Sequence, residues 1–240
     1  MKTRLDRLLV ERGLADSREK AQALIMAGEV LLDGQKASKP GQPVGDAAAI
    51  EVLARPPYVS RGGRKLAGAL EQFAIAVAGK VCLDIGSSTG GFTDALLQAG
   101  ASRVHAVDVG KGQLAWPLRT DARVVIHEGI NARELEFARI GELVWLLTCD
   151  VSFISVTLIL PAAVPLLQPA GRMVILIKPQ FEVGKGLVGK GGIVREPELH
   201  QAACDRVSGA VRDLGFGTTI MESPILGAEG NKEFLLYGQH

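Results

Sequence analysis

The sequence has few cysteines, few aromatic residues and almost no net charge. Its three cysteines, Cys82, Cys149 and Cys204, lie far apart in apolar or helical patterns. This spacing argues against a disulfide framework and predicts a reduced, cytoplasmic protein. Lysine and arginine total 27 against 26 acidic residues, a net charge of +1. A basic field over the whole molecule is therefore excluded, and any contact with nucleic acid must be local.

Long apolar runs and metal-ligand spacings are lacking too. The most apolar stretches, such as 144–147 and 174–177, have the length of a strand and fall far short of the ~20 residues of a membrane span. The four histidines are scattered, and no Cys/His cluster has ligand spacing, so we predict no metal and no membrane contact. The polar N-terminus does not resemble a signal peptide. At 47% hydrophobic residues, the chain can bury a sizeable core.

The first 53 residues have the pattern of a small α+β domain. Apolar residues recur at helical spacing in two stretches, and strand and turn signals follow. The pattern predicts, in order, a helix from Leu5, a helix capped by Asp16-Ser17 and ended by Gly28, a strand over 30–32, a turn at Asp33-Gly34, a loop over 37–45 and a strand over 50–52.

A linker over 54–59 is predicted from Arg55-Pro56-Pro57-Tyr58, because adjacent prolines favour a stiff extended segment. From residue 60 to 240 strands and helices alternate, which is typical of a parallel sheet with helices on both faces. Its last two strands are predicted to form an antiparallel hairpin, as in Rossmann-like methyltransferase sheets. Strands are predicted over 81–85, 103–108, 124–127, 144–150, 173–178, 218–222 and 234–237, and helices from Gly91, near 157–167 and over 197–213.

A glycine-rich turn follows the first strand of this second domain. The strand ends in Asp84 and turns through Gly86, Gly90 and Gly91 into a helix, where free N–H groups meet a ligand. The spacing Gly-x-x-x-Gly-Gly differs from the dinucleotide fingerprint and favours S-adenosylmethionine, which has no phosphate. An ordinary strand-to-helix turn is the alternative. The predicted donor-binding residues here are Asp84, Gly86, Ser88, Thr89, Gly90, Gly91 and Phe92.

Further chemistry is predicted at the ends of the later strands, where ligands bind in such sheets. Asp108 is placed to bind ribose hydroxyls of the donor, and Asn131 to line its adenine pocket. An aspartate that only caps a helix or a turn is the alternative for Asp108. Asp150 ends the fourth strand and is predicted to contact the donor as well, and the preceding Cys149 is not expected to be a nucleophile. Lys178 leaves a buried strand, where burial and neighbours can lower the pKa of a lysine toward that of a general base. A lysine that reaches solvent from the strand end is the alternative.

The N-terminal pattern is similar to a known RNA-binding module. Residues 4–21, Arg-Leu-Asp-Arg-Leu-Leu-Val-Glu-Arg-Gly-Leu-Ala-Asp-Ser-Arg-Glu-Lys-Ala, and 25–34, Ile-Met-Ala-Gly-Glu-Val-Leu-Leu-Asp-Gly, resemble the module of ribosomal protein S4. In that module two short helices present basic side chains to RNA. The resemblance implies that Arg4, Arg7, Arg18 and Lys20 meet RNA phosphates, with Lys36 and Lys39 as further candidates. A merely solvated charged helix face is the alternative.

Four charged residues carry a second resemblance. Lys65, Asp150, Lys178 and Glu233 resemble, in that order, the Lys-Asp-Lys-Glu tetrad of FtsJ-like ribose 2′-O-methyltransferases. With the runs 112–116, 150–155 and 178–186, the chain resembles the TlyA family over nearly its full length. That resemblance implies S-adenosylmethionine-dependent methylation of a cytidine ribose in rRNA of ribosomal subunits. Lys178, held by Asp150, would orient and deprotonate the hydroxyl. Glu233 would orient or tune the lysines, and Lys65 would either complete the charge network or hold the target nucleotide.

Additional RNA contacts are predicted at Arg61, Arg64, Lys185 and Lys190. The last two lie in 184–191, which spells most of a P-loop but has glycine where Mg²⁺ needs a hydroxyl, so a basic loop beside the site is expected. Two other functions stay open at this point. One is a non-catalytic RNA-binding or ribosome-assembly protein, and the other is a membrane-active haemolysin, a label attached to this family.

Overall fold

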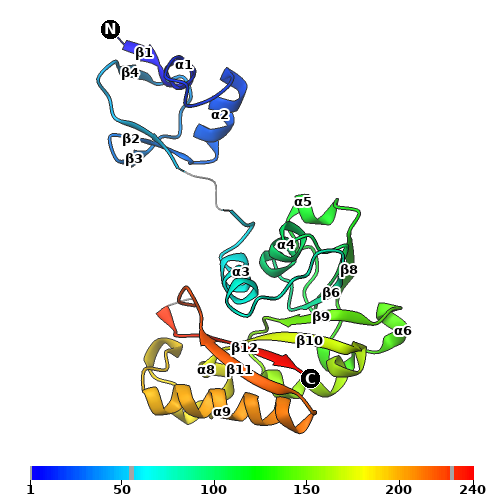
Figure 1. The fold of residues 1–240 in the computed structure, drawn as a ribbon. Helices are drawn as coiled ribbons and strands as arrows, with labels where there is room; N and C mark the ends of the chain where they lie inside the picture. Colours follow the sequence, from blue (N-terminus) through cyan, green and yellow to red (C-terminus); the bar gives the residue numbers. More distant parts are fainter. Residues whose placement is uncertain (1, 54–56, 228–229) are drawn as a thin grey trace. The chain divides into compact units, whose positions relative to one another are not determined.

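The computed structural model describes residues 2–53, 57–227 and 230–240, and the chain divides into two compact units, Met1–Pro56 and Pro57–His240 (Figure 1). Each unit has its own apolar core. The predicted linker falls partly on 54–56, including Arg55 and Pro56, which lie outside the described residues. The two units are therefore described one at a time.

The N-terminal unit packs two helices on short strands. Its elements are β1 (Lys2–Arg4), α1 (Leu5–Glu11), α2 (Arg18–Met26), β2 (Val30–Leu32), β3 (Gln35–Lys36), β4 (Pro43–Gly45) and β5 (Ile50–Val52). The Ser17 hydroxyl accepts a hydrogen bond from the Lys20 N–H at 3.2 Å and so caps α2, as predicted. Gly28 ends that helix with a φ of +70°.

The strands of this unit form two small sheets. One has the order β3-β2-β5, and its β2–β3 hairpin turns at Asp33 and Gly34, both with positive φ, as predicted. In the other, β1 pairs antiparallel with β4. The prediction of a loop over 37–45 is wrong at β4, because Pro43 tolerates an edge position that needs no N–H donor and the strand signal is very short.

The second unit is built on a seven-stranded sheet of order β11-β12-β10-β9-β6-β7-β8. The neighbouring pairs among β10, β9, β6, β7 and β8 are parallel, whereas β12 runs antiparallel to both β10 and β11. The predicted terminal hairpin is thereby confirmed. The strands are β6 (Val81–Ile85), β7 (Arg103–Asp108), β8 (Val124–Glu128), β9 (Val144–Cys149), β10 (Leu167–Ile177), β11 (Gly217–Glu222) and β12 (Phe234–Gln239).

Helices cover both faces of this sheet, as predicted, with α3 and α4 on one face and α9 on the other (Figure 1). Leu66 of α3 and Leu96 of α4 are fully buried in one apolar cluster, and Val207 of α9 in the other. The helices are α3 (Gly62–Gln72), α4 (Gly91–Gln98), α5 (Trp116–Arg119), α6 (Phe137–Ile140), α7 (Leu160–Ala163), α8 (Pro179–Glu182) and α9 (Pro197–Asp213). Short 3-10 turns lie at Ala132–Glu134, Val156–Leu158, Val164–Leu166, Lys185–Leu187 and Lys190–Gly192.

Two element predictions need correction. The helix expected near 157–167 is broken into α7 and two flanking 3-10 turns, because Pro161 and Pro165 each remove a helical N–H donor. Strand β10 begins at Leu167, six residues before the predicted start, and its pairing with β9 is interrupted by a register shift between Leu167 and Arg172. Pro169 and Gly171 are of residue types that are rare in strands, so the sequence pattern did not predict this early part of β10.

The strand order creates a crevice at the carboxyl ends of β6 and β9. The chain moves outward from β6 to β7 and β8, then returns to lay β9 on the opposite side of β6. Loops leaving β6 and β9 therefore diverge, which opens space for a ligand at this point of the sheet. Asp84 and Asp150 belong to these two strand ends.

Candidate active site

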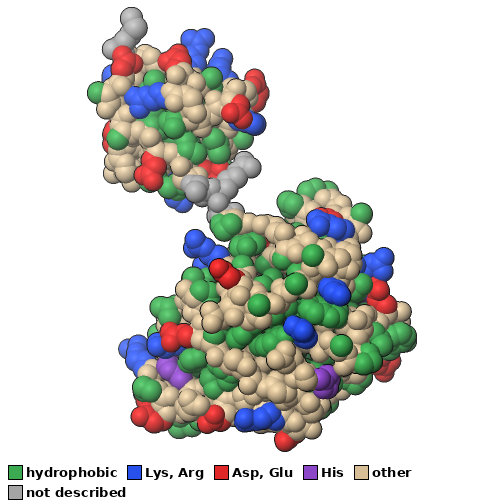
Figure 2. Space-filling model, in the orientation of Figure 1, with side chains coloured by type: hydrophobic (Ala, Val, Ile, Leu, Met, Phe, Trp, Pro, Cys, Tyr) green, Lys and Arg blue, Asp and Glu red, His purple; other side chains and the backbone are tan. Residues whose placement is uncertain are grey.

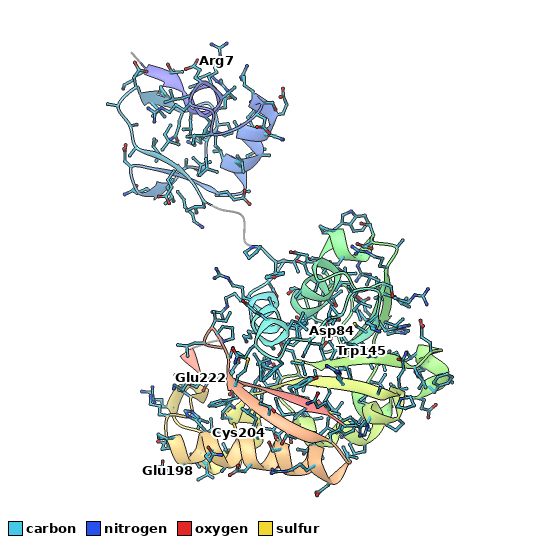
Figure 3. All side chains as sticks on the ribbon, viewed as in Figure 1. Arg7, Asp84, Trp145, Glu198, Cys204 and Glu222 are labelled. Carbon is cyan, nitrogen blue, oxygen red and sulfur yellow. The ribbon has the colours of Figure 1, made fainter. Side chains whose placement is uncertain are left out.

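The Asp84 carboxylate is a buried anchor beneath the glycine turn. It is fully buried and accepts hydrogen bonds from the hydroxyls of Thr93, at 2.6 Å, and Thr148, at 3.0 Å. Burial raises the pKa of Asp84 to about 7. Asp84 lines neither of the two cavities described below, and Figure 3 shows it within the sheet. The prediction of a direct donor contact is therefore not supported, and Asp84 fixes the start of α4 instead.

The turn after β6 packs directly on the end of β9. Gly86 has a φ of +81°, and a Cβ built on it would collide with the backbone carbonyl of Asp150. The Asp150 N–H in turn donates to the Ile85 carbonyl at 2.9 Å. Glycine is required at position 86 both for its backbone conformation and for this close approach.

Asp108 holds the other side of the crevice. Its carboxylate accepts hydrogen bonds from the backbone N–H groups of Ser88, at 2.8 Å, and Gly110, at 2.6 Å. Each carboxylate oxygen has a second lone pair, so both can still accept from ribose hydroxyls. Asp108 lines a cavity of about 530 Å³ together with Val109, Gln113 and Asn131.

A larger cavity of about 740 Å³ lies beside it, and both are lined by Gly86, Ser88 and Asp150. An elongated ligand can therefore extend from one to the other. Among the predicted donor-binding residues, the larger cavity is lined by Gly86, Ser88, Thr89, Gly91, Phe92 and Asp150. Gly90 lines neither cavity; it precedes α4 with a φ of +98°, against the side chains of Leu114 and Leu118.

The Asp150–Lys178 pair stands at the ends of the adjacent parallel strands β9 and β10. Lys178 Nζ lies 2.6 Å from Asp150 Oδ1 and donates a hydrogen bond to the Ser152 hydroxyl at 2.9 Å. The contact with Asp150 is an ion pair without hydrogen-bond alignment. Both side chains are mostly buried, at 11% and 21% exposure, yet both line the larger cavity. The lysine head is thus fixed within reach of a ligand.

Lys65 and Glu233 form a second ion pair in the same cavity. Lys65 comes from α3, and Glu233 immediately precedes β12. The pair is buried, with 8% and 3% of the side chains exposed. The four tetrad residues predicted from sequence therefore converge on one cavity as two ion pairs. Such pairs restrict each lysine head to one orientation toward the cavity.

Two aromatic residues at this cavity escaped the sequence analysis. Phe153 is 92% exposed and adopts a φ of +66°, a strained value for a residue with a side chain. Its ring lies 5.3 Å from that of Phe181, and both line the larger cavity. The runs 150–155 and 178–186 contain these two residues, but their exposure at a cavity cannot be recognised from residue type.

A buried carboxylate, Glu182, supports the segment that carries Phe153. It is 4% exposed and accepts hydrogen bonds from the Ser155 hydroxyl, at 2.6 Å, and the Val156 N–H, at 2.9 Å. Glu182 ends α8, the helix that begins directly after Lys178. Glu182 therefore links the loop after β9 to the loop after β10 by hydrogen bonds, a link that no local sequence pattern indicates.

The predicted RNA-binding side chains lie in different surroundings. Arg4 and Arg18 contact Asp6, whereas Lys20 pairs with Asp16 on the exposed surface. Arg7 is exposed on the N-terminal unit, where basic and acidic side chains are interspersed (Figures 2 and 3). In the second unit Arg61 lines the larger cavity, and Arg64 and Lys190 are exposed. The side chain of Lys185 lies outside what the structure describes.

The thiols are unsuited to nucleophilic chemistry. Cys82, Cys149 and Cys204 are free and buried, and burial raises the pKa of each. Across residues 2–53, 57–227 and 230–240, no group of three His, Cys, Asp or Glu side chains is arranged to hold a metal ion. None of the helices in these ranges has the length and apolar character that crossing a bilayer requires.

S-adenosylmethionine fits this arrangement. The smaller cavity offers Asp108 for ribose hydroxyls and apolar walls around Asn131 for an adenine, and the larger one offers the close backbone of the glycine turn. The two cavities meet at Asp150, next to the Lys178 head. Fold and site together define a Rossmann-like, S-adenosylmethionine-dependent methyltransferase.

Comparison with known proteins specifies the class further. The FtsJ-like methyltransferase family matches residues 58–240, and the S4 domain matches residues 3–50. The 16S/23S rRNA (cytidine-2′-O)-methyltransferase TlyA of Mycobacterium tuberculosis is 49% identical, with 98% of this chain and 89% of the relative covered. The chain belongs to the FtsJ-like methyltransferases and, among them, to the TlyA family, as the sequence indicated.

Two further relatives bear another name. Hemolysin A of Brachyspira hyodysenteriae is 44% identical, with 98% of both chains covered. A solved structure from Streptococcus thermophilus that carries the hemolysin name is 43% identical, covers 99% of this chain and 88% of its own, and superposes with a TM-score of 0.76. The predicted fold class, the methyltransferase activity and the methyl donor are confirmed by these matches and by the fold.

Proposed function

We propose that this protein transfers the methyl group of S-adenosylmethionine to the ribose 2′-hydroxyl of a cytidine in rRNA, within ribosomal subunits. The observation that carries the proposal is the Lys178–Asp150 pair, at 2.6 Å, beside a second buried pair, Lys65–Glu233, in one cavity. The activity for which the Mycobacterium tuberculosis relative is named supports rRNA cytidine as the target. The same arrangement argues against a binding protein without catalysis.

The reaction needs a weak nucleophile to be placed and deprotonated. The bound donor supplies an electrophilic methyl group on a sulfonium. The ribose oxygen must approach that methyl in line, so the oxygen–methyl bond forms as the sulfur–methyl bond breaks. Once its ammonium has released a proton to water, Lys178 holds the hydroxyl at its Nζ and accepts the hydroxyl proton as the new bond forms, a role worth about 10²- to 10⁴-fold in rate.

The other charged residues support Lys178. Asp150 and Ser152 fix the direction of the Lys178 head through the contacts at 2.6 and 2.9 Å. Lys65 carries a second positive charge in the cavity, oriented by Glu233, and holds the target nucleotide. Because the four charged groups interact, their protonation equilibria belong to the set rather than to one residue.

The ring of Phe153 can stack on the target base after that base has left the RNA helix. A base whose ribose enters the cavity has to leave its neighbours, and an aromatic face recovers about 1–3 kcal/mol per stacked base. Phe153 is 92% exposed at the cavity and backed by Phe181, so its ring is available to a base. Its strained backbone is consistent with a functional rather than a packing role.

The proposal divides the chain by task. Residues 1–53 bind rRNA, 54–59 link the units and 60–240 carry out methyl transfer. The match of the S4 domain to residues 3–50 and the basic side chains of the N-terminal unit support the first assignment. Exposed Lys190 and cavity-lining Arg61 provide phosphate contacts next to the reaction centre.

The experiment uses purified protein, methyl-labelled S-adenosylmethionine and ribosomal subunits that lack the modification. Label should appear in rRNA and survive alkaline cleavage in a dinucleotide, because a 2′-O-methyl group blocks attack on the adjacent phosphate. Digestion to nucleosides should place the label in 2′-O-methylcytidine. Absence of label from every rRNA, with donor binding intact, would falsify the proposal and favour a non-catalytic RNA-binding protein.

A further inference from the structure

A buried carboxylate in the N-terminal unit gathers two of the predicted RNA-binding arginines. Asp6, in the first turn of α1, is fully buried. Arg4 donates to both of its oxygens, from Nε at 3.0 Å and from Nη2 at 2.8 Å. Arg18 Nη2 donates at 3.2 Å and Gln22 Nε2 at 2.9 Å, both to Oδ2. We call these four residues the Asp6 cluster.

Arg4 is held on a second side as well. A Cβ built on Gly41 would lie 3.1 Å from Arg4 Nη1 and 3.3 Å from its Cζ. The guanidinium of Arg4 therefore rests on the bare backbone of Gly41 while it makes a two-point contact with Asp6. This combination leaves one orientation for the Arg4 head.

Both arginines still face solvent. Their side chains are 49% and 45% exposed, although the carboxylate that holds them is inaccessible. A guanidinium has five N–H donors; two of Arg4 and one of Arg18 bond Asp6, so three and four remain for other acceptors. Planar donors fixed in advance suit phosphate oxygens, because little side-chain freedom is lost on binding.

Lys20, which lies on α2 as Arg18 does, is held differently from the two arginines. Lys20 pairs with Asp16, and these side chains are 66% and 84% exposed. An exposed pair of this kind contributes little energy and leaves the lysine mobile. Within the part of the chain that the structure describes, two carboxylates contact predicted RNA-binding cations, one buried and multiply bonded and one in solvent. They form a matched pair for an experiment.

We propose that Asp6 is a positioning residue that fixes Arg4 and Arg18 as a two-arginine clamp for RNA phosphates. Asp6 itself does not touch the RNA. Its hydrogen bonds from Arg4 hold the pKa of the carboxyl well below its usual range, so the clamp persists at any pH at which the protein works. The inference rests on the proposed function in one respect, that the ligand of this unit is rRNA.

Asp6→Asn separates this role from simple electrostatics by the sign of its effect. Removing a negative charge from an RNA-binding surface tightens binding if charge alone matters. If Asp6 positions the arginines, Asp6→Asn instead weakens binding by about tenfold. The slope of log K against log salt should also become shallower, by an amount that corresponds to the loss of roughly one to two phosphate contacts. Asp16→Asn removes the same charge from the exposed pair and should leave affinity unchanged or tighter.

A second variant tests the clamp without touching Asp6. Gly41→Ala places a methyl group against the Arg4 guanidinium and displaces it, while every charge is retained. We expect a several-fold loss of affinity. Because Asp6 is buried, thermal unfolding of each variant is measured first, and binding is compared at a temperature at which all are folded.

Binding of the full-length protein to unmodified ribosomal subunits is measured without donor, and methylation is measured separately. The expected result is a raised KM for subunits with unchanged kcat and unchanged donor affinity in Asp6→Asn and Gly41→Ala. If folded Asp6→Asn binds as tightly as wild type or more tightly, the inference is wrong even where methylation proceeds. If wild type binds subunits but methylates nothing, the proposed function fails while the clamp remains measurable.

Discussion

Lys178 Nζ lies 2.6 Å from Asp150 Oδ1, and the two residues follow adjacent parallel strands. Parallel neighbours end at the same edge of a sheet, so the 27 residues between Asp150 and Lys178 do not separate the two side chains in space. The pair is therefore built into the sheet rather than into a flexible loop. This rigidity is what a group that must hold a hydroxyl in line with a methyl group requires.

Loss of either member of this pair should abolish catalysis without loss of the fold. We expect Lys178→Ala and Asp150→Asn each to lower kcat by at least about 100-fold. The double variant should be no worse than the poorer single one, because the two residues act as a unit. Steady-state methylation of subunits at saturating donor gives kcat. Lys232→Ala, which breaks an exposed ion pair with Glu222, serves as control; Lys178→Ala with full activity contradicts the assignment.

The buried Lys65–Glu233 pair should matter for stability as well as activity. Glu233→Gln leaves the Lys65 ammonium without its partner in a buried site and should lower the free energy of unfolding by about 3 kcal/mol or more. The exposed counterpart Glu222→Gln should cost under ~1 kcal/mol. Urea unfolding measures both.

An apolar double replacement separates these two effects. Lys65→Met with Glu233→Leu removes both buried charges and should recover most of the lost stability. Methylation should stay as low as in Glu233→Gln. A double variant that is stable and fully active would show that this pair only supports the fold.

Phe153 should contribute to activity and little to stability. Phe153→Gly relieves a φ of +66° but loosens the unfolded chain, so the free energy of unfolding should change by under ~1 kcal/mol. Loss of base stacking should lower kcat/KM by roughly 10- to 100-fold. Phe153→Trp should retain activity, and Phe137→Ala, a half-exposed aromatic on α6, should have no effect. Unchanged kcat/KM in Phe153→Gly excludes the stacking role.

The buried Asp84 predicts a pH dependence of stability. Its pKa is raised from the ordinary 3.8 to about 7. Between these pH values the folded protein binds more protons than the unfolded chain, so the contribution of Asp84 to stability falls as pH rises from about 4 to 7. In Asp84→Asn that dependence is removed while contacts to both threonines are kept.

Urea unfolding of wild type and Asp84→Asn across this range tests the sign. The stability of Asp84→Asn relative to wild type should increase by up to ~4 kcal/mol from pH 4 to pH 7 and then level off, at about 1.4 kcal/mol per pKa unit. A relative stability that decreases over the same range would mean that Asp84 is ionised in the folded protein.

The location of the site could be predicted from the sequence, because simple physical rules decide where the ends of parallel strands lie. Apolar runs separated by glycine turns indicate parallel strands, and the strands of such a sheet present their carboxyl ends together. Asp108, Asp150 and Lys178 each follow or end a predicted strand, so their convergence was expected. Lys65 and Glu233 were predicted as site residues only through the family resemblance, since neither follows a predicted strand end or lies in a motif that indicates a site.

The pairing of the charges was beyond reach from sequence. Lys65 meets Glu233 across 168 positions of the chain, and which lysine pairs with which acid depends on how α3 packs beside β12. Asp84 was misassigned for a related reason. It is the fourth residue of a five-residue strand, so alternation turns its side chain toward Thr93 of α4 and not into the cavity.

Short and irregular elements were missed where local signals conflict. Strand β4 contains a proline, and the early part of β10 contains both proline and glycine, so each resembles a loop in composition. Arg4 and Arg18 were predicted as separate RNA contacts. Their common partner Asp6 is two residues from one and twelve from the other, and an acid in the first turn of a helix gives no sign that it is buried.

The contact between Gly86 and the Asp150 carbonyl limits how this enzyme can be re-engineered. Donor analogues with larger transferable groups need more space near the sulfonium. Any side chain at position 86 would push on the backbone of Asp150, the residue proposed to orient Lys178, so enlargement there is expected to disable the chemistry it was meant to broaden. Val109 and Gln113 line the smaller cavity on the Asp108 side, so enlargement there would admit a larger adenosine portion of a donor but not a larger transferable group.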